Sequence, residues 1–187
     1  MRLSKQQADD NREHILETAI DLFRVYGFDG VGVAQLMRAA GFTHGGFYNH
    51  FPSKQALAVE ACTRAFARSQ VLLARALDGD NAYAWQAYVT EFLADQPNKT
   101  CTLAALAADA GRQDPDVQAT FVDGIEAMLG TISGYLGADA DKGEQRLRAL
   151  QRLNELVGAW VLARAVSHAS PSLAQEIRAA GRACWAG

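Results

Sequence analysis

Apolar residues recur at helical spacing along most of the chain, and this periodicity restricts the sequence to an all-α fold. Between Val117 and Tyr135, for example, apolar side chains return at steps of three or four residues, which places them on one face of a helix. Alternating runs of β-branched residues, which are typical of strands, are missing. The prolines stand at positions 52, 97, 115 and 171, each near an expected helix end.

Composition narrows the class of protein further. The chain has 187 residues, of which 49% are apolar, and a formal net charge of −3, which argues against indiscriminate nucleic-acid binding. We expect neither a secretory signal nor a membrane span, because no long uncharged apolar run occurs. Three widely separated cysteines indicate reduced thiols, so we expect a cytoplasmic protein without disulfides.

Four helices are predicted in the first part of the chain, at about 11–26, 33–40, 43–51 and 53–77. Gly27 and Gly41 follow the first two helices, as helix-terminating glycines do, and Thr43 is expected to cap the third. A three-residue turn containing Gly41 between two helices indicates a helix-turn-helix unit. An ordinary α-hairpin is the alternative.

The short third helix has an unusual outer face. On a helical wheel, Phe47 and Phe51 point inward, whereas Gly45 and Asn49 form the centre of the opposite face. Missing Cβ atoms let a backbone approach a partner closely, and free N–H groups in a first turn suit phosphate. We therefore interpret this face as a DNA contact. A tight helix crossing that requires glycine is the alternative.

Residues 12–57 resemble the N-terminal domain of the TetR/AcrR family of bacterial transcriptional regulators. The resemblance rests on GFTHGGFYNHFPSKQAL and on the upstream pattern I-L-x-x-A-x-x-L-F-x-x-x-G, which begins at Ile15. Two positions depart from the family pattern, since Gly32 replaces a capping Ser or Thr and Ala34 replaces a frequent Arg. Phosphate contacts from Arg38 or from the N-terminal arm (Arg2, Lys5, Arg12) are therefore expected as substitutes.

The resemblance implies roles for individual positions. Thr43, His44 and Gly45 would lie at operator bases or backbone, and Tyr48, His50 and Lys54 would bind phosphates. Side-chain type adds His44 and Asn49 as readers of base edges. The complete predicted DNA-binding set is Thr43, His44, Gly45, Gly46, Tyr48, Asn49, His50, Lys54 and Arg38.

Five further helices are expected at about 81–95, 101–111, 115–136, 142–167 and 172–184, about nine in all. We divide the chain into a helix-turn-helix domain at 1–57, with an arm at 1–10, and an effector and dimerisation domain at 58–187. By resemblance, one set of residues would line a ligand cavity, although ordinary core packing is the alternative: Cys62, Phe66, Trp85, Tyr88, Phe92, Cys101, Phe121 and Ile125. A second set would form the dimer interface: Leu153, Val157, Trp160, Val161, Leu173, Ile177 and Cys184.

Cys101 opens a predicted helix, where the partial positive charge of the N-terminus would lower the pKa of the thiol and raise its reactivity. Lys99 would act in the same direction. A small buried apolar side chain is the alternative. No metal-ligand spacing and no catalytic constellation occurs, so we expect no metal, no cofactor and no enzymatic activity.

Together these features predict a ligand-responsive homodimeric repressor. It would bind a palindromic double-stranded DNA operator and be released by a small effector that is mostly apolar or reactive. Two alternatives stay open at this point: a constitutive DNA-binding protein without an inducer, and a helical small-molecule binder whose DNA-binding domain is vestigial.

Overall fold

The computed structural model describes residues 4–78, 82–94, 101–136 and 141–183. Within these ranges it contains eight α-helices, one 3-10 helix and no strand, in agreement with the predicted all-α class. The elements are α1 (Lys5–Tyr26), α2 (Val33–Ala39), η1 (His44–Asn49), α3 (Lys54–Leu77), α4 (Ala82–Phe92), α5 (Thr102–Ala110), α6 (Pro115–Tyr135), α7 (Lys142–Val166) and α8 (Pro171–Ala183).

Local signals explain where α1 begins and ends. The Ser4 hydroxyl accepts a hydrogen bond from the Gln7 N–H, and the Gln7 side chain accepts one from the Ser4 N–H, both at 3.1 Å, which forms a capping box. The helix therefore starts at Lys5, so residues 5–10 of the predicted arm are helical. At the other end Gly27 adopts a φ of 75° and terminates the helix as predicted.

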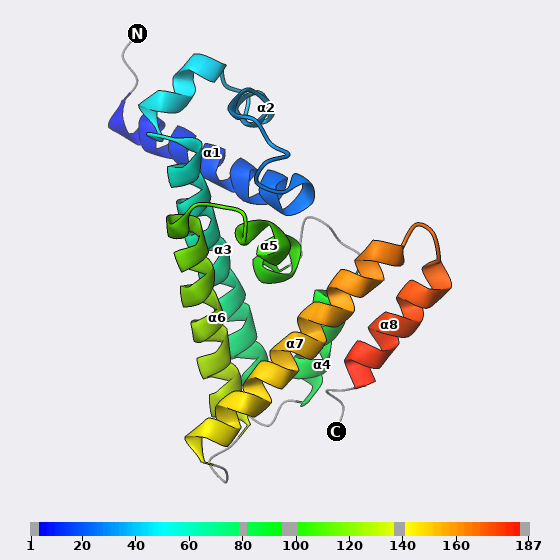
Figure 1. The fold of residues 1–187 in the computed structure, drawn as a ribbon. Coiled ribbons are helices and arrows are strands. Elements are labelled where there is room, and N and C mark those ends of the chain that lie inside the picture. Colours follow the sequence, from blue (N-terminus) through cyan, green and yellow to red (C-terminus); the bar gives the residue numbers. More distant parts are fainter. Residues whose placement is uncertain (1–3, 79–81, 95–100, 137–140, 184–187) are drawn as a thin grey trace.

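Two long helices form the frame of the molecule. α3 and α6 run side by side in the same direction, and α5 lies beside them (Figure 1). α1, α2 and η1 gather at the end of the molecule where α3 begins, whereas α7 and α8 form a hairpin on another side (Figure 1). The frame thus connects the helix-turn-helix to the rest of the chain through an unbroken helix.

A single cluster of buried apolar residues extends from α1 to α7. Phe28, which follows α1, packs edge-on against Phe121 of α6 with ring centroids 6.5 Å apart, and Phe66 of α3 lies 5.1 Å from the same ring. The predicted domain boundary between 57 and 58 lies inside α3, so the two parts share one helix and one core.

Ion pairs join α1 to α3 on the surface. Arg68 of α3 binds the Glu17 carboxylate at 2.5 Å, and Arg64 of the same helix pairs with Glu13 and Glu17. The hydrogen bond from Arg68 lowers the pKa of Glu17 below its usual value. These pairs join α1 to the middle of α3. No helix in the described part of the chain is long and apolar enough to cross a bilayer.

Candidate nucleic-acid interface and effector region

The predicted third helix is present, but it is a 3-10 helix and not an α-helix. The chain turns at Gly41, whose φ is 78°, and enters η1 with the Gly46 N–H donating to the Thr43 carbonyl at 3.0 Å. The Thr43 hydroxyl makes no capping hydrogen bond, so that expectation is wrong. Six residues at three per turn give η1 two turns, which is longer than most 3-10 helices.

The inner and outer faces of η1 nevertheless follow the prediction. Phe47 and Phe51 are buried, with ring centroids 5.8 Å apart, because Phe51 lies beyond the last turn and is free to pack beside Phe47. His50 is only half-exposed, since three residues per turn align it with the buried Phe47. Tyr48 is 64% exposed. The other fully outward positions are Thr43, His44, Gly45 and Asn49, with Gly46 half-exposed.

Packing inside the protein does not explain the two adjacent glycines. A Cβ added at Gly45 would meet no atom within 4 Å, and one at Gly46 would lie 3.6 Å from the Met37 Cε atom, an ordinary contact. Neither glycine has a positive φ. The tight crossing considered as an alternative is therefore wrong for this site, and the bare backbone of η1 faces solvent.

Basic side chains flank this face unevenly. Arg38 is exposed on α2 and makes no ion pair with any described residue, and Lys54 is half-exposed at the first position of α3. Arg12, proposed above as a substitute phosphate contact, instead binds both oxygens of the Glu60 carboxylate at 2.6 and 2.5 Å. Arg2 lies outside the described residues. Among the basic residues predicted to contact phosphate, Arg38 and Lys5 are thus exposed and Lys54 is half-exposed.

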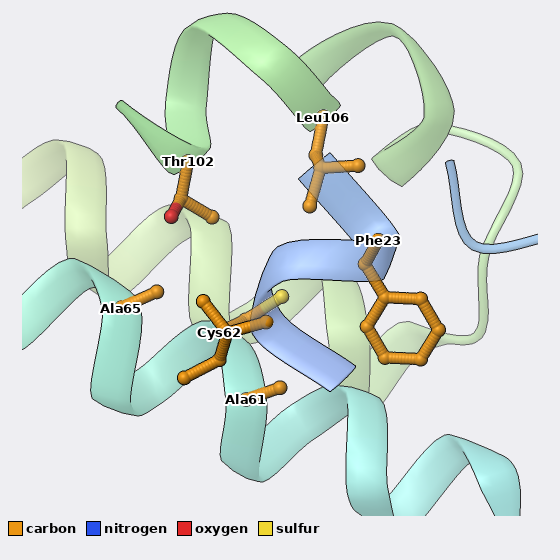
Figure 2. A pocket seen from close by; sticks show the side chains of 7 residues that line it. Phe23, Ala61, Cys62, Ala65, Thr102 and Leu106 are labelled. Carbon is orange, nitrogen blue, oxygen red and sulfur yellow. The ribbon is translucent and has the colours of Figure 1, made fainter. Parts of the chain in front are cut away.

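The ligand-lining candidates on α3 and α6 are packed core residues. The cavity beside Cys62 measures only about 10 Å³, roughly the space of one water molecule. Figure 2 shows Thr102 and Leu106 of α5 closing it from the side opposite Cys62. Phe66 fills the space over Gly124, where a Cβ would collide with the ring. Burial raises the pKa of the Cys62 thiol to about 12.

The candidates on α4 form a second aromatic group. Trp85 stacks on Tyr88 with ring centroids 5.5 Å apart, and Tyr88 lies 6.1 Å from Phe92. Tyr135 at the end of α6 also stacks on Trp85, with ring centroids 6.3 Å apart. Burial raises the pKa of the Tyr88 hydroxyl. Ile125, the remaining candidate on α6, is half-buried and packs against the main core. The structure therefore divides the predicted ligand residues into two groups.

Cys101 occupies the N-cap of α5, as the sequence suggested, but its environment differs from the expected one. The side chain is buried and not in a disulfide. Burial raises the pKa of the thiol and outweighs the nearby backbone N–H groups and the Arg24 charge, which act in the opposite direction. The predicted lowering of this pKa is wrong, and the prediction for Lys99 falls outside the described residues.

Sequence reasoning overlooked the contacts that join the helix-turn-helix to α5. Arg24 of α1 donates twice to the Thr102 hydroxyl at 3.3 Å, and only 13% of its side chain is exposed. The Asp109 carboxylate lies against Gly27. The Arg24 and Thr102 pair is separated by 78 residues, so no local spacing could have indicated it.

The residues predicted to form the dimer interface differ in how deeply they are buried. Leu153 and Trp160 are 4% and 7% exposed and pack against the core of their own chain. They have almost no surface to offer, because an apolar stripe on α7 packs inward. Val157 and Ile177 are half-buried, Val161 and Leu173 are each 43% exposed, and Cys184 lies outside the described residues.

Among the described residues, no group of His, Cys, Asp and Glu could hold a metal ion.

Comparison with known proteins places this geometry in a family. The family model described as bacterial regulatory proteins, tetR family, matches residues 15–61, which span most of α1, α2, η1 and the start of α3. The transcriptional repressor NemR of Escherichia coli K12 is 26% identical over 141 residues, which cover 72% of this chain and 71% of NemR. These matches support a regulator of the TetR/AcrR family. The proteins that it resembles in this comparison are helix-turn-helix transcriptional regulators.

Other relatives agree with this assignment. The regulator AcrR of Shigella flexneri is 39% identical over 56 residues, or 30% of this chain and 26% of AcrR. The reduced form of E. coli NemR superposes with a TM-score of 0.74 at 23% identity, covering 92% of this chain and 95% of NemR. A TetR regulator from Chloroflexus aurantiacus reaches 0.75 at 21% identity, with 95% of each chain covered. These structures share the fold of this chain over the parts that superpose.

Proposed function

We propose that this TetR-family regulator is a homodimeric repressor that binds a palindromic operator and is released by a small effector. The observation that carries the proposal is the outer face of η1. Its two glycines are not required by packing or by backbone conformation, and the exposed side chains around them can all form hydrogen bonds. A face of this kind suits close contact with a duplex.

Within this proposal the outward residues of the site have different tasks. His44 and Asn49 contact base edges in the major groove, and Gly45 and Gly46 let the backbone approach the DNA. Thr43, Tyr48, His50, Lys54 and Arg38 contact the sugar-phosphate backbone and set the register. Phosphate contacts contribute affinity for all sequences, whereas base contacts create the preference for one.

Dimerisation is proposed through α7 and α8, which offer Val161 and Leu173 as exposed apolar side chains. A two-fold dimer would present two η1 elements to half-sites separated by one helical turn, about 34–36 Å. An effector weakens DNA binding only if it binds better to a state in which this spacing is lost. The buried thiols favour a noncovalent, mostly apolar effector that contacts the aromatic group around Tyr88 over a reactive one.

The proposal is tested with the DNA upstream of the gene that encodes the chain. Fluorescence anisotropy would compare this fragment with a scrambled duplex at several salt concentrations. His44→Ala should reduce the preference for the native fragment, and Tyr48→Phe should weaken binding to both duplexes alike. His168→Ala and Tyr83→Phe make the same changes at exposed positions on the surface of the effector part and should have no effect. Absence of binding by the parent protein would refute the proposal.

A constitutive DNA-binding protein is the second candidate, favoured by the nearly filled space beside Cys62. A thermal-shift screen with small apolar compounds separates the two candidates, because a ligand that binds the folded state raises its melting temperature. Compounds that raise it and also release the fragment support the repressor. A screen without such compounds, combined with specific DNA binding, supports the constitutive protein.

A further inference from the structure

Arg12 occupies a point where three elements of the helix-turn-helix meet. It lies on α1, its guanidinium binds both carboxylate oxygens of Glu60 on α3, and its Cζ atom stands 4.5 Å from the ring centroid of Phe51, just after η1. A planar guanidinium can bind a carboxylate with one edge while its face stacks on an aromatic ring, which a lysine cannot do. The side chain thereby connects α1, η1 and α3.

The contact between Arg12 and Phe51 also restrains the residues of η1 that are proposed to face DNA. Phe51 is buried beside Phe47, and its N–H donates to the Phe47 carbonyl at 3.0 Å, the last backbone hydrogen bond of this segment. Phe47 in turn meets the exposed Tyr48 ring edge-on, with centroids 5.3 Å apart. A displacement of Phe51 would therefore move the backbone and ring that carry Tyr48.

In this ion pair, the basic and acidic residues lie on opposite helices from those in the neighbouring pairs. In the other pairs between these helices, α1 contributes acids and α3 contributes arginines, as in Glu17 with Arg68. Arg12 with Glu60 has the opposite arrangement. A shift of α3 by one turn toward its N-terminus would place Arg64 near Arg12 and replace attraction by repulsion. The reversed pair thus specifies the register in which η1 is held.

We propose that Arg12 is a positioning residue for DNA recognition, which holds η1 in place through Phe51 and Glu60 and does not contact phosphate. The proposal rests on the DNA-binding function proposed above. It predicts that loss of Arg12 reduces affinity for the native fragment without changing the number of phosphate contacts. A phosphate-binding arginine would behave differently, because its loss lowers the slope of log K against log salt by about one.

Glu60→Gln should change DNA affinity in opposite directions, depending on whether Arg12 binds phosphate or positions η1. Removing an acid near the DNA face should strengthen binding if Arg12 contacts phosphate, because the freed guanidinium becomes available and negative charge is lost. If Arg12 positions η1, the same change should weaken binding to the native fragment by about tenfold, within the range for one lost base contact. Glu176→Gln, which removes an exposed acid on α8, is the matched control and should change nothing.

The experiment combines DNA binding with hydrogen exchange on the free protein. Arg12→Met and Glu60→Gln should each weaken native-fragment binding about tenfold at an unchanged salt slope, and Arg12→Lys should restore part of the affinity. The amides of His50 and Phe51 should exchange faster in both variants, while amides within α7 keep the parent rate. Circular dichroism confirms that each variant is folded.

Three results would overturn the positioning role: a salt slope reduced by about one in Arg12→Met, stronger DNA binding by Glu60→Gln, or unchanged exchange at His50 and Phe51. Because exchange is measured without DNA, it decides the role of Arg12 even if the parent protein binds no fragment. In that case the repressor proposal fails separately.

Discussion

Replacing Gly45 by alanine should make the protein more stable and its DNA binding weaker. The added Cβ meets no protein atom within 4 Å, and the backbone at this position is accessible to alanine. Removing glycine at such a site restricts mainly the unfolded chain and stabilises the fold by about 0.4–1 kcal/mol. For a chain of this length, 1 kcal/mol corresponds to a rise of about 2–4 °C in melting temperature.

The same methyl group should hinder the DNA complex. If the backbone of η1 approaches the duplex as proposed, an extra carbon in a close-packed contact costs about 1–3 kcal/mol, which is about 5- to 150-fold in Kd. Thermal unfolding and fluorescence anisotropy on the upstream fragment measure the two effects in one preparation. The matched control is Gly130→Ala on the exposed side of α6, where a Cβ also meets nothing. It should raise the melting temperature and leave Kd unchanged.

An affinity of Gly45→Ala within about twofold of the parent value would show that the glycine is not needed for close approach. A lower melting temperature would contradict the open surroundings seen for this residue. Either result would remove the main support for the DNA-facing role of η1.

Gly27→Ala should lower the melting temperature by several degrees, because φ is positive there and the new Cβ would collide with the Asp109 carboxylate; an unchanged temperature would argue against this close contact. Alkaline pH should destabilise the fold through Cys62. Its pKa rises from 9.0 to about 12 on folding, so its contribution is complete below pH 9 and is lost toward pH 12, at up to about 1.4 kcal/mol per pH unit. Urea unfolding should show a steeper fall in stability with pH in the parent than in Cys62→Ala, where the raised pKa values of Cys101 and Tyr88 still contribute. Acid should loosen α1 from α3, since the lowered pKa of Glu17 contributes stability above about pH 4.5 that is lost as pH falls through the folded-state value. Glu17→Gln should flatten this part of the urea profile, and Arg68→Gln should do the same if their hydrogen bond is the cause.

Helix limits were the most predictable part of the fold, because they depend on residues next to one another in the chain. Ser53 accepts from the Ala56 N–H at the start of α3, and Pro115 stands in the first turn of α6. The start of α1 also had a local signal, the capping-box spacing of Ser4 and Gln7, which lies outside the apolar pattern and was overlooked.

The features that were missed depend on tertiary contacts. The 3-10 geometry of η1 could not be read from its apolar pattern, since Phe47 points inward at three or at 3.6 residues per turn. Arg12 and Glu60 are 48 residues apart, so their pairing has no sequence signature. The pKa of Cys101 is decided by burial, which outweighs its position at a helix start. An apolar residue such as Trp160 does not reveal whether it faces its own core or a partner.

The continuity of α3 has a mechanical consequence. Its 24 residues span about 36 Å at a rise of 1.5 Å each, with Lys54 beside the DNA face and Leu77 at the far end of the molecule. A tilt of about five degrees about the Leu77 end would carry Lys54 sideways by about 3 Å over this length. Because α3 is unbroken, a small change in the position of the helices packed near Leu77 would shift its other end by a distance comparable to one base-pair step.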